Sequence, residues 1–307
     1  MKDLYKNCRI CPRDCGADRT AGINGYCGEG SELRLAFAGL HFGEEPPLVG
    51  RGGSGTIFIS GCNLGCAFCQ NWQISSPRSH RYANSGGSLG RAVSVNEFTG
   101  ICLNLQKKGA ENINIVTGSH AIPALALGIK TVKAKGLKIP ILWNSSGYEK
   151  VDTLELLSGC IDVFLPDLKT LDNTLSGKFF NAPNYPQAAT KAISWMIENP
   201  AQIIIRHLIL PGLLESTHSV LKWFAENAAG KALLSIMSQY TPPAAANSYS
   251  PGRFVTKKEY ETVIGWLEEF GIEDGYCQEL VSESGWLPDF RRENPFLSKL
   301  SVPVWNY

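Results

Sequence analysis

Six short apolar runs, separated by segments with helical spacing, most constrain the fold of this chain. The runs are rich in Ile, Val and Leu and cover residues 56–59, 113–117, 139–143, 161–165, 203–210 and 233–237. Helical spacing of apolar residues appears between them at 95–108, 123–135, 151–157, 185–198 and 217–227. Short apolar runs that alternate with helices are typical of βα units around a parallel sheet. We therefore expect an α/β fold, a partial (β/α)6 barrel of about six strands, with a doubly wound sheet as the alternative.

Cysteine content and Gly/Pro-rich stretches suggest three parts. The expected parts are an N-terminal cysteine-rich metal-binding module at 1–45, a barrel at 46–240, and a C-terminal helix and tail covering the barrel at 241–307. Gly and Pro gather at 43–55, which favours a boundary there. A strand is expected at 33–40 and a helix at 256–270.

The charge balance bears on the partners of the chain, whereas its first residues and its cysteines favour a location in the cytoplasm. Lys and Arg number 29 against 28 Asp and Glu, without long charged blocks, which argues against nucleic acid as a partner. Residues 1–10 lack the apolar core of a signal peptide, and the uncharged stretch 112–129 is too polar to cross a membrane. In a reducing compartment, the ten cysteines are expected to be metal ligands or catalytic groups more often than disulfides.

Three cysteines directly follow the first apolar run. Cys62, Cys66 and Cys69 lie in "SGCNLGCAFCQNWQIS" with the spacing C-x3-C-x2-C. Three thiolates can hold three irons of a [4Fe–4S] cluster and leave the fourth iron open for a ligand. Phe68 would supply an apolar wall. A zinc site completed by a distant His and three buried structural thiols are the alternatives.

This C-x3-C-x-aromatic-C motif resembles that of the radical S-adenosylmethionine (radical SAM) superfamily. The stretch "EEPPLVGRGGSGTIFISGCNLGCAFCQNWQIS" is similar to the pyruvate formate-lyase activating enzyme-like (PflX-type) group, and "WNSSGYE", "LPDLK", "IRHLILPG" and "MSQYTP" extend the likeness along the chain.

The resemblance implies an oxygen-sensitive oxidoreductase of anaerobic chemistry. The open iron would bind the amino and carboxylate groups of S-adenosylmethionine (SAM). One electron, from a donor such as flavodoxin or ferredoxin, would then break a carbon–sulfur bond and release a 5′-deoxyadenosyl radical that abstracts hydrogen. The activase group further implies a glycyl radical enzyme as a partner.

Charged residues at two later strand ends are candidate cofactor ligands. Asp167 and Lys169 resemble the D-L-K element of the activases, which implies contact with SAM and with substrate backbone; a surface salt bridge is the alternative. Arg206 interrupts an apolar strand and needs a partner, because desolvating a lone charge is costly. That partner could be the SAM carboxylate or Asp167. The alternative is that Arg206 forms a purely structural buried pair. His207, on the opposite face, is expected to pack in the core.

Polar residues at the remaining strand ends are further candidates. Activases carry a Gly-Gly-Glu type element after the second strand, whereas this chain has Thr117, Gly118 and His120 with no carboxylate among them. Backbone carbonyls, the Thr117 hydroxyl or His120 could take its place. Asn144 and Ser145 end the third run, and Gln239 follows the sixth.

Four more cysteines precede the barrel. Cys8, Cys11, Cys15 and Cys27 have the spacing C-x2-C-x3-C-x11-C among glycines, which indicates a closed second metal site. Zinc and a second iron–sulfur cluster both fit, and a structural metal is the favoured interpretation. Cys8, Cys11 and Cys15 could themselves hold an open cluster, but the strand before Cys62 favours the later cysteines.

These observations leave three classes of function. The first is a radical SAM enzyme that activates a glycyl radical enzyme. The second is a radical SAM enzyme acting on a peptide side chain or small metabolite, which a closed pocket and a substrate-covering tail would favour. The third is a non-enzymatic iron–sulfur electron carrier, which an open three-cysteine site argues against.

Overall fold

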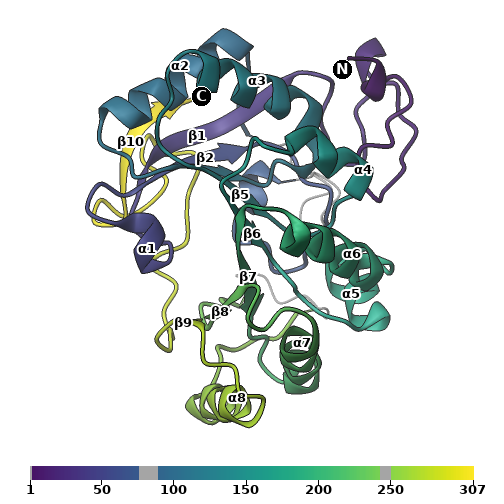
Figure 1. Ribbon diagram of the computed structural model, residues 1–307, viewed down its shortest axis with the longest axis vertical. Helices are drawn as coiled ribbons and strands as arrows, with labels where there is room; N and C mark the ends of the chain where they lie inside the picture. Colours follow the sequence, from purple (N-terminus) through teal and green to yellow (C-terminus); the bar gives the residue numbers. More distant parts are fainter. Residues whose placement is uncertain (1, 76–88, 243–249) are drawn as a thin grey trace.

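The six expected strands form the centre of one sheet in the computed structural model, which describes residues 2–75, 89–242 and 250–307. They are β2 (Ser54–Ile59), β4 (Ile113–Val116), β5 (Ile141–Ser145), β6 (Val163–Pro166), β7 (Gln202–Leu208) and β8 (Leu233–Met237). Each pairs in parallel with its predecessor along the chain. A doubly wound sheet reverses its strand order at a switch point, and this one does not. The partial barrel is thus confirmed (Figure 1).

The sheet continues beyond these strands to ten among the described residues. β1 (Leu33–His41), expected near 33–40, is antiparallel to β2, and β10 (Ser301–Asn306) is antiparallel to β1. β9 (Gly275–Cys277) extends the other edge beside β8, and β3 (Arg91–Val93) pairs with β1. The sequence did not predict β3, β9 or β10, because short edge strands carry little periodicity and their partners lie far away in the chain.

Helices surround the sheet on its outer face (Figure 1). They are α2 (Val95–Lys107), α3 (Ile122–Ala134), α4 (Val151–Leu154), α5 (Asn173–Phe180), α6 (Tyr185–Glu198), α7 (Leu214–Asn227) and α8 (Lys257–Glu269). Short 3-10 turns cover Lys2–Tyr5, Arg19–Ala21, Trp72–Ile74, Ser119–Ala121 and Glu155–Leu157. The sequence did not predict α5. None of the helices within the described ranges is long and apolar enough to cross a membrane.

Side chains alternate between the two faces of each strand, so they divide into an outer and an inner set. Ile57, Ile115 and Trp143 face outward into the main hydrophobic core and are fully buried. On β2 the inner face therefore carries Ser54, Thr56 and Phe58. The inner face thus includes polar side chains, which is the expected arrangement for a barrel that takes a polar ligand.

The end of the barrel where the parallel strands begin is closed by a short helix, α1 (Pro46–Val49). Leu48 of α1 packs in one buried cluster with Leu142, Val163, Leu165 and Ile204 from the inner face. Asn112, just before β4, donates its side-chain N–H to the Leu48 carbonyl oxygen at 2.6 Å. Among the described residues, this end of the interior is therefore filled by apolar side chains.

The C-terminal segment crosses the gap between the two edges of the sheet. Residues 278–300 connect β9 at one edge with β10 at the other. Phe290 and Phe296 of this segment pack against Phe58 of the inner face, with ring centroids 5.3 and 5.4 Å away. Gln73 donates to Asp289 at 2.8 Å and accepts from the Phe290 N–H at 2.7 Å. The tail is thereby tied to the inner face beside β2.

His207 is a core residue, as expected, with 1% of its surface exposed. Its Nδ1–H donates to the Leu168 carbonyl oxygen at 2.7 Å, and its Nε2 accepts from the Thr217 hydroxyl at 3.0 Å. Burial lowers the pKa of His207 to about 4 from 6.5. Both ring nitrogens are thus satisfied by the neutral form.

Acidification is expected to destabilise the fold through this histidine. Between pH 6.5 and about 4 the imidazole of the unfolded chain binds a proton, whereas the buried imidazole of the folded protein stays neutral. The free energy of unfolding therefore decreases as the pH is lowered through this window. The resulting loss of unfolding free energy between pH 7 and about pH 4 is at most about 3 kcal/mol. Urea unfolding between pH 7.5 and 4 should show a shallower pH dependence in His207→Gln, whose amide can keep both hydrogen bonds. An equal slope in both proteins would contradict this role.

Candidate active site

The loop with Cys62, Cys66 and Cys69 leaves the carboxyl end of β2 and is held by the end of α5. The Gly65 N–H donates to the Phe180 carbonyl oxygen at 3.0 Å, and the Ala67 N–H donates to that of Phe179 at 2.8 Å. The Phe68 ring lies 5.9 Å from the Phe180 ring and 5.4 Å from that of Tyr240. Phe68 therefore anchors the cysteine loop to its neighbours.

The three thiols of this loop share one environment with Lys169. Cys62, Cys66 and Cys69 are all partly exposed free thiols. Burial, and then the neighbouring Cys69, raises the pKa of Cys62 to about 12, while Lys169 opposes the rise. Burial also raises the pKa of Cys66, where Lys169 again opposes the effect and both other thiols add to it. Cys62 and Cys66 are thus protonated when free and need a bound cation to become thiolates.

Asp167 and Lys169 form an ion pair at the end of β6. The Lys169 Nζ lies 2.5 Å from the Asp167 Oδ2, and their side chains are only 19% and 23% exposed. Burial alone would lower the pKa of Lys169, but Asp167, Cys66 and Tyr185 together outweigh it and raise this pKa. The Tyr185 hydroxyl donates to the Asp167 carbonyl oxygen at 2.7 Å and accepts from the Lys169 N–H at 3.0 Å. The pair is therefore largely buried, with its backbone held in place.

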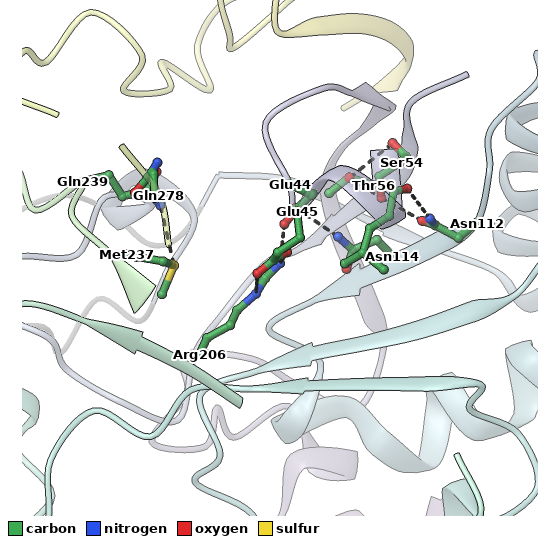
Figure 2. A network of polar contacts seen from close by, with 11 residues as sticks. Glu44, Glu45, Ser54, Thr56, Asn112, Asn114, Arg206, Met237, Gln239 and Gln278 are labelled. Carbon is green, nitrogen blue, oxygen red and sulfur yellow. Dashed lines mark hydrogen bonds and ion pairs between the residues drawn. The ribbon is translucent and has the colours of Figure 1, made fainter. Parts of the chain in front are cut away.

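Arg206 has carboxylate partners that the sequence did not predict. Its Nε donates to Glu45 Oε1 at 2.8 Å, its Nη2 also contacts Glu45, and the same Nη2 lies 2.6 Å from Glu44 Oε2 (Figure 2). Burial would raise the pKa of Glu45, but Arg206 outweighs it and lowers this pKa. Among the described residues, the Arg206 side chain is therefore paired with Glu44 and Glu45 and not with Asp167, which matches the alternative of a structural buried pair. Its contact with a SAM carboxylate stays a prediction. The two glutamates lie before α1 and reach Arg206 only through the fold.

The end of β4 carries backbone strain. Thr117 has φ of +64°, which is a rare conformation for a β-branched residue and often accompanies a functional site. At Gly118 a Cβ would lie 2.6 Å from the Trp143 ring, so only glycine fits there. His120 is 2% exposed, and its Nε2–H donates to the Ser60 carbonyl oxygen at 2.9 Å. His120 thus supports the backbone before Cys62.

Glu149 is a carboxylate that the sequence analysis missed. It is 3% exposed and accepts from Trp143 Nε1 at 2.7 Å and from the Ser119 and Ser145 hydroxyls, each at 2.9 Å. Burial raises the pKa of Glu149. Ser145 is thus occupied by Glu149, whereas Asn144 beside it is partly exposed. The Glu that ends "WNSSGYE", four residues after Ser145, was the available signal.

Gln239 lies between the end of β8 and the cysteine loop. Its carbonyl oxygen accepts from Gln70 Nε2 at 3.1 Å, and its side-chain oxygen accepts from Gln278 Nε2 at 3.0 Å (Figure 2). Its own Nε2 lies 3.9 Å from the Met237 sulfur. Gln239 thereby connects the cysteine loop to β8 and β9.

The four N-terminal cysteines lie against the central cysteine loop. A Cβ on Gly25 would lie 3.3 Å from the Cys27 sulfur and 3.6 Å from the Cys15 sulfur, and the Arg19 Nη1 donates to the Cys8 sulfur at 3.7 Å. Cys8, Cys11 and Cys27 are buried, and Cys15 is exposed.

Two hydrogen bonds join this group to the loop. The Cys62 N–H donates to the Cys27 carbonyl oxygen at 3.4 Å, and Arg13 Nε donates to the Asn63 carbonyl oxygen at 2.7 Å. The two cysteine groups are thus direct neighbours.

The donor chemistry of the central loop fits a cluster better than a single ion. In the described ranges no three His, Cys, Asp or Glu side chains are gathered to hold one metal ion. The same holds for Cys8, Cys11, Cys15 and Cys27, so this finding concerns both cysteine groups alike. A [4Fe–4S] cluster instead takes one thiolate at each of several separate irons. Three thiols beside a buried Lys–Asp pair suit such a group with one open iron.

Comparison with known proteins places the chain in a family. Residues 56–224 match the model of the radical SAM superfamily. An uncharacterized protein of Methanocaldococcus jannaschii is 30% identical over 89% of this chain and 77% of its own length. A radical SAM methyltransferase from Sphaerobacter thermophilus has a similar fold, with a TM-score of 0.52, 14% identity, and coverage of 73% of this chain and 65% of its own.

SuiB of Streptococcus suis also shares the fold, with a TM-score of 0.50, 17% identity and coverage of 74% of this chain. The chain spans only 48% of the length of SuiB. The matched residues 56–224 include the cysteine loop, the Asp167–Lys169 pair and Arg206. The chain therefore belongs to the radical SAM superfamily, whose members use a [4Fe–4S] cluster and SAM for radical chemistry.

Proposed function

We propose that Cys62, Cys66 and Cys69 hold the [4Fe–4S] cluster of a radical SAM enzyme and leave one iron for SAM. The observation that carries this proposal is the meeting of three thiols with the Asp167–Lys169 pair at the open end of the barrel. When bound, the cluster and SAM supply a 5′-deoxyadenosyl radical that takes a hydrogen atom from the substrate.

The residues around the thiols would bind and orient SAM. Asp167 and Lys169 offer one charge of each sign to a ligand that carries an amino and a carboxylate group. Asn144, Thr117 and Gln239 are partly exposed and offer hydrogen bonds at neighbouring strand ends. Phe68 keeps the loop in place and His120 supports its first residues. Gly118 keeps the end of β4 close to Trp143.

The tail favours a substrate that enters the barrel from the cysteine end. Phe290 and Phe296 pack on the inner face beside β2, so this side of the barrel is already covered by the chain itself. A small metabolite or a peptide side chain needs only the open end, whereas a partner's glycyl loop would need wider access. We therefore propose the former as substrate.

Activation of a glycyl radical enzyme is the second candidate. The likeness of the D-L-K element at Asp167–Lys169 to the PflX-type, activase-like group supports it. The test is electron paramagnetic resonance of a candidate glycyl radical enzyme that has been incubated with this protein and SAM. A glycyl radical doublet is expected if this protein is an activase, and no doublet is expected if it acts on a small metabolite or a peptide side chain.

Formation of 5′-deoxyadenosine tests the central proposal. Protein reconstituted without oxygen and reduced by flavodoxin, ferredoxin or dithionite is expected to convert SAM to 5′-deoxyadenosine. A protein that holds its cluster and forms none, with or without candidate substrates, would sink the proposed function and leave the electron-carrier class.

We also propose that Cys8, Cys11, Cys15 and Cys27 hold a second metal group, zinc or an iron–sulfur cluster. The thiol chemistry of these four residues and their position against the central cysteine loop support this second metal site. Metal analysis of Cys11→Ala should then show the loss of zinc, or of about one cluster's iron and its absorbance, while 5′-deoxyadenosine formation tests the central group separately. Cys160→Ala, a buried cysteine outside both groups, should keep both. Unchanged metal content in Cys11→Ala would refute a second site.

A further inference from the structure

The inner face of the barrel carries a buried charged group whose charges do not cancel. Arg206 of β7 pairs with Glu44 and Glu45, and the exposed fractions of the three side chains are 8%, 12% and 7%. Asn114 of β4 donates its Nδ2–H to Glu44 Oε1 at 3.0 Å (Figure 2). We call these four residues the floor group. Two carboxylates face one guanidinium, so the floor group retains one negative charge.

Other titratable side chains nearby do not remove this charge. Lys169 is paired with Asp167 at 2.5 Å. Burial lowers the pKa of His41, which lies in the field of Glu44, so its ring is neutral at pH 7. In the part of the chain that the structure describes, no cationic side chain other than Arg206 pairs with either glutamate.

Two buried polar atoms beside Glu44 lack partners. Asn114 is fully buried, and its Oδ1 has no hydrogen-bond partner among the described residues. The same holds for the Nδ1 of His41. Unpartnered buried polar atoms are unfavourable and rare in folded proteins. The amide oxygen of Asn114 needs an N–H or O–H donor, which the described residues around it do not supply.

The floor group lies within reach of the cysteine end. Arg206 precedes Leu208 by two positions on β7, and Asn114 precedes Val116 by two on β4, which corresponds to about 7 Å along a strand. Val116, Leu208 and Met237 face inward at the strand ends and are partly exposed. A ligand bound beneath the cysteine loop would therefore contact an apolar upper layer and then the charged floor.

We propose that the barrel binds its substrate through a cationic nitrogen group, an amine or a guanidinium, that docks on Glu44 and Asn114 Oδ1. Such a group brings several N–H donors and the positive charge that the floor group lacks. A free amine and the side chain of a peptide Lys or Arg share this chemistry. This inference deepens the proposed function and rests on it, because the docked molecule is the one whose carbon would face the cysteine loop.

Equilibrium binding without turnover tests the inference. Reconstituted protein with SAM, but without reductant, is titrated calorimetrically with agmatine, Nα-acetyl-arginine amide, Nα-acetyl-lysine amide and the neutral Nα-acetyl-citrulline amide. At least one cation should bind, and the citrulline compound at least ten times more weakly than its arginine counterpart. Agmatine alone would indicate a free small molecule, and the blocked amino acids a peptide side chain.

Matched variants locate the site. Glu44→Gln should weaken binding of the cation at least tenfold, whereas Glu259→Gln, which changes a carboxylate paired with the exposed Arg253, should not. If Glu44→Gln does not fold, the comparison of arginine with citrulline in the unaltered protein decides. Failure of all cations to bind, equal binding of the citrulline compound, or full binding by a folded Glu44→Gln would overturn the inference.

The two proposals fail separately. Formation of 5′-deoxyadenosine by a protein that binds no cation would overturn this inference alone. Cation binding by a cluster-loaded protein that never cleaves SAM would overturn the proposed function and leave the floor group as a binding site.

Discussion

Replacing Cys66 with alanine is expected to reduce 5′-deoxyadenosine formation from SAM to the background of a reaction without protein. Cys66 lies between Cys62 and Cys69 in the loop after β2, and its thiol shares the field of Lys169 with that of Cys62. Three thiolates are needed to hold a [4Fe–4S] cluster with one open iron, so a loop with two cannot keep it in place. The product is quantified by chromatography after anaerobic reduction, with iron measured on the same sample.

A core cysteine provides the matched control. Cys102 is fully buried in α2 among apolar side chains, so Cys102→Ala should retain the product and the iron of the central cluster. If Cys66→Ala formed 5′-deoxyadenosine as the unaltered protein does, the cluster would lie elsewhere. Cys8, Cys11 and Cys15 would then be the cysteines to replace.

Arg206→Met is expected to lower the free energy of unfolding by about 3–5 kcal/mol. The variant leaves Glu44 and Glu45 with their charges in the barrel interior and no guanidinium to offset them. Methionine fills much of the space of the arginine stem, so the loss comes mainly from uncompensated charge. Urea unfolding at pH 7.5, followed by circular dichroism, gives the difference between the two proteins.

An exposed arginine that pairs with a glutamate of α8 makes the comparison specific. Arg253 pairs with Glu259 at 2.6 Å, but its side chain is 50% exposed, so Arg253→Met should cost only about 0–1 kcal/mol. Equal losses of unfolding free energy in the two variants would mean that the charges of Glu44 and Glu45 are well solvated. That result would contradict the buried floor group described above.

Much of the fold could be predicted from the sequence because its central strands are local signals. Each of the six parallel strands is an apolar run that is visible without knowledge of its neighbours. β9 and β10 are different, because each becomes a strand only by pairing at an edge of the sheet, β10 with β1 more than 250 residues away in the chain. α5 is short and follows the D-L-K element without a clear apolar stripe, so periodicity did not indicate it.

The residues of the candidate site also divide into those that the sequence could place and those that only the fold brings together. Cys62, Cys66, Cys69, Asp167 and Lys169 follow strands directly, so their place at the open end follows from the order of the strands. Chain order alone determined that placement, since parallel strands all finish at one end.

Tertiary structure alone decided which groups meet inside the barrel. Glu44 and Glu45 come from a loop that the sequence indicated only as a boundary, and the fold brings them to Arg206. Glu149 likewise reaches Ser119 only once β4 and β5 are paired. Spacing along a chain records which residues share a strand end, but burial and charge pairing depend on contacts between distant segments, and these exist only in the folded protein.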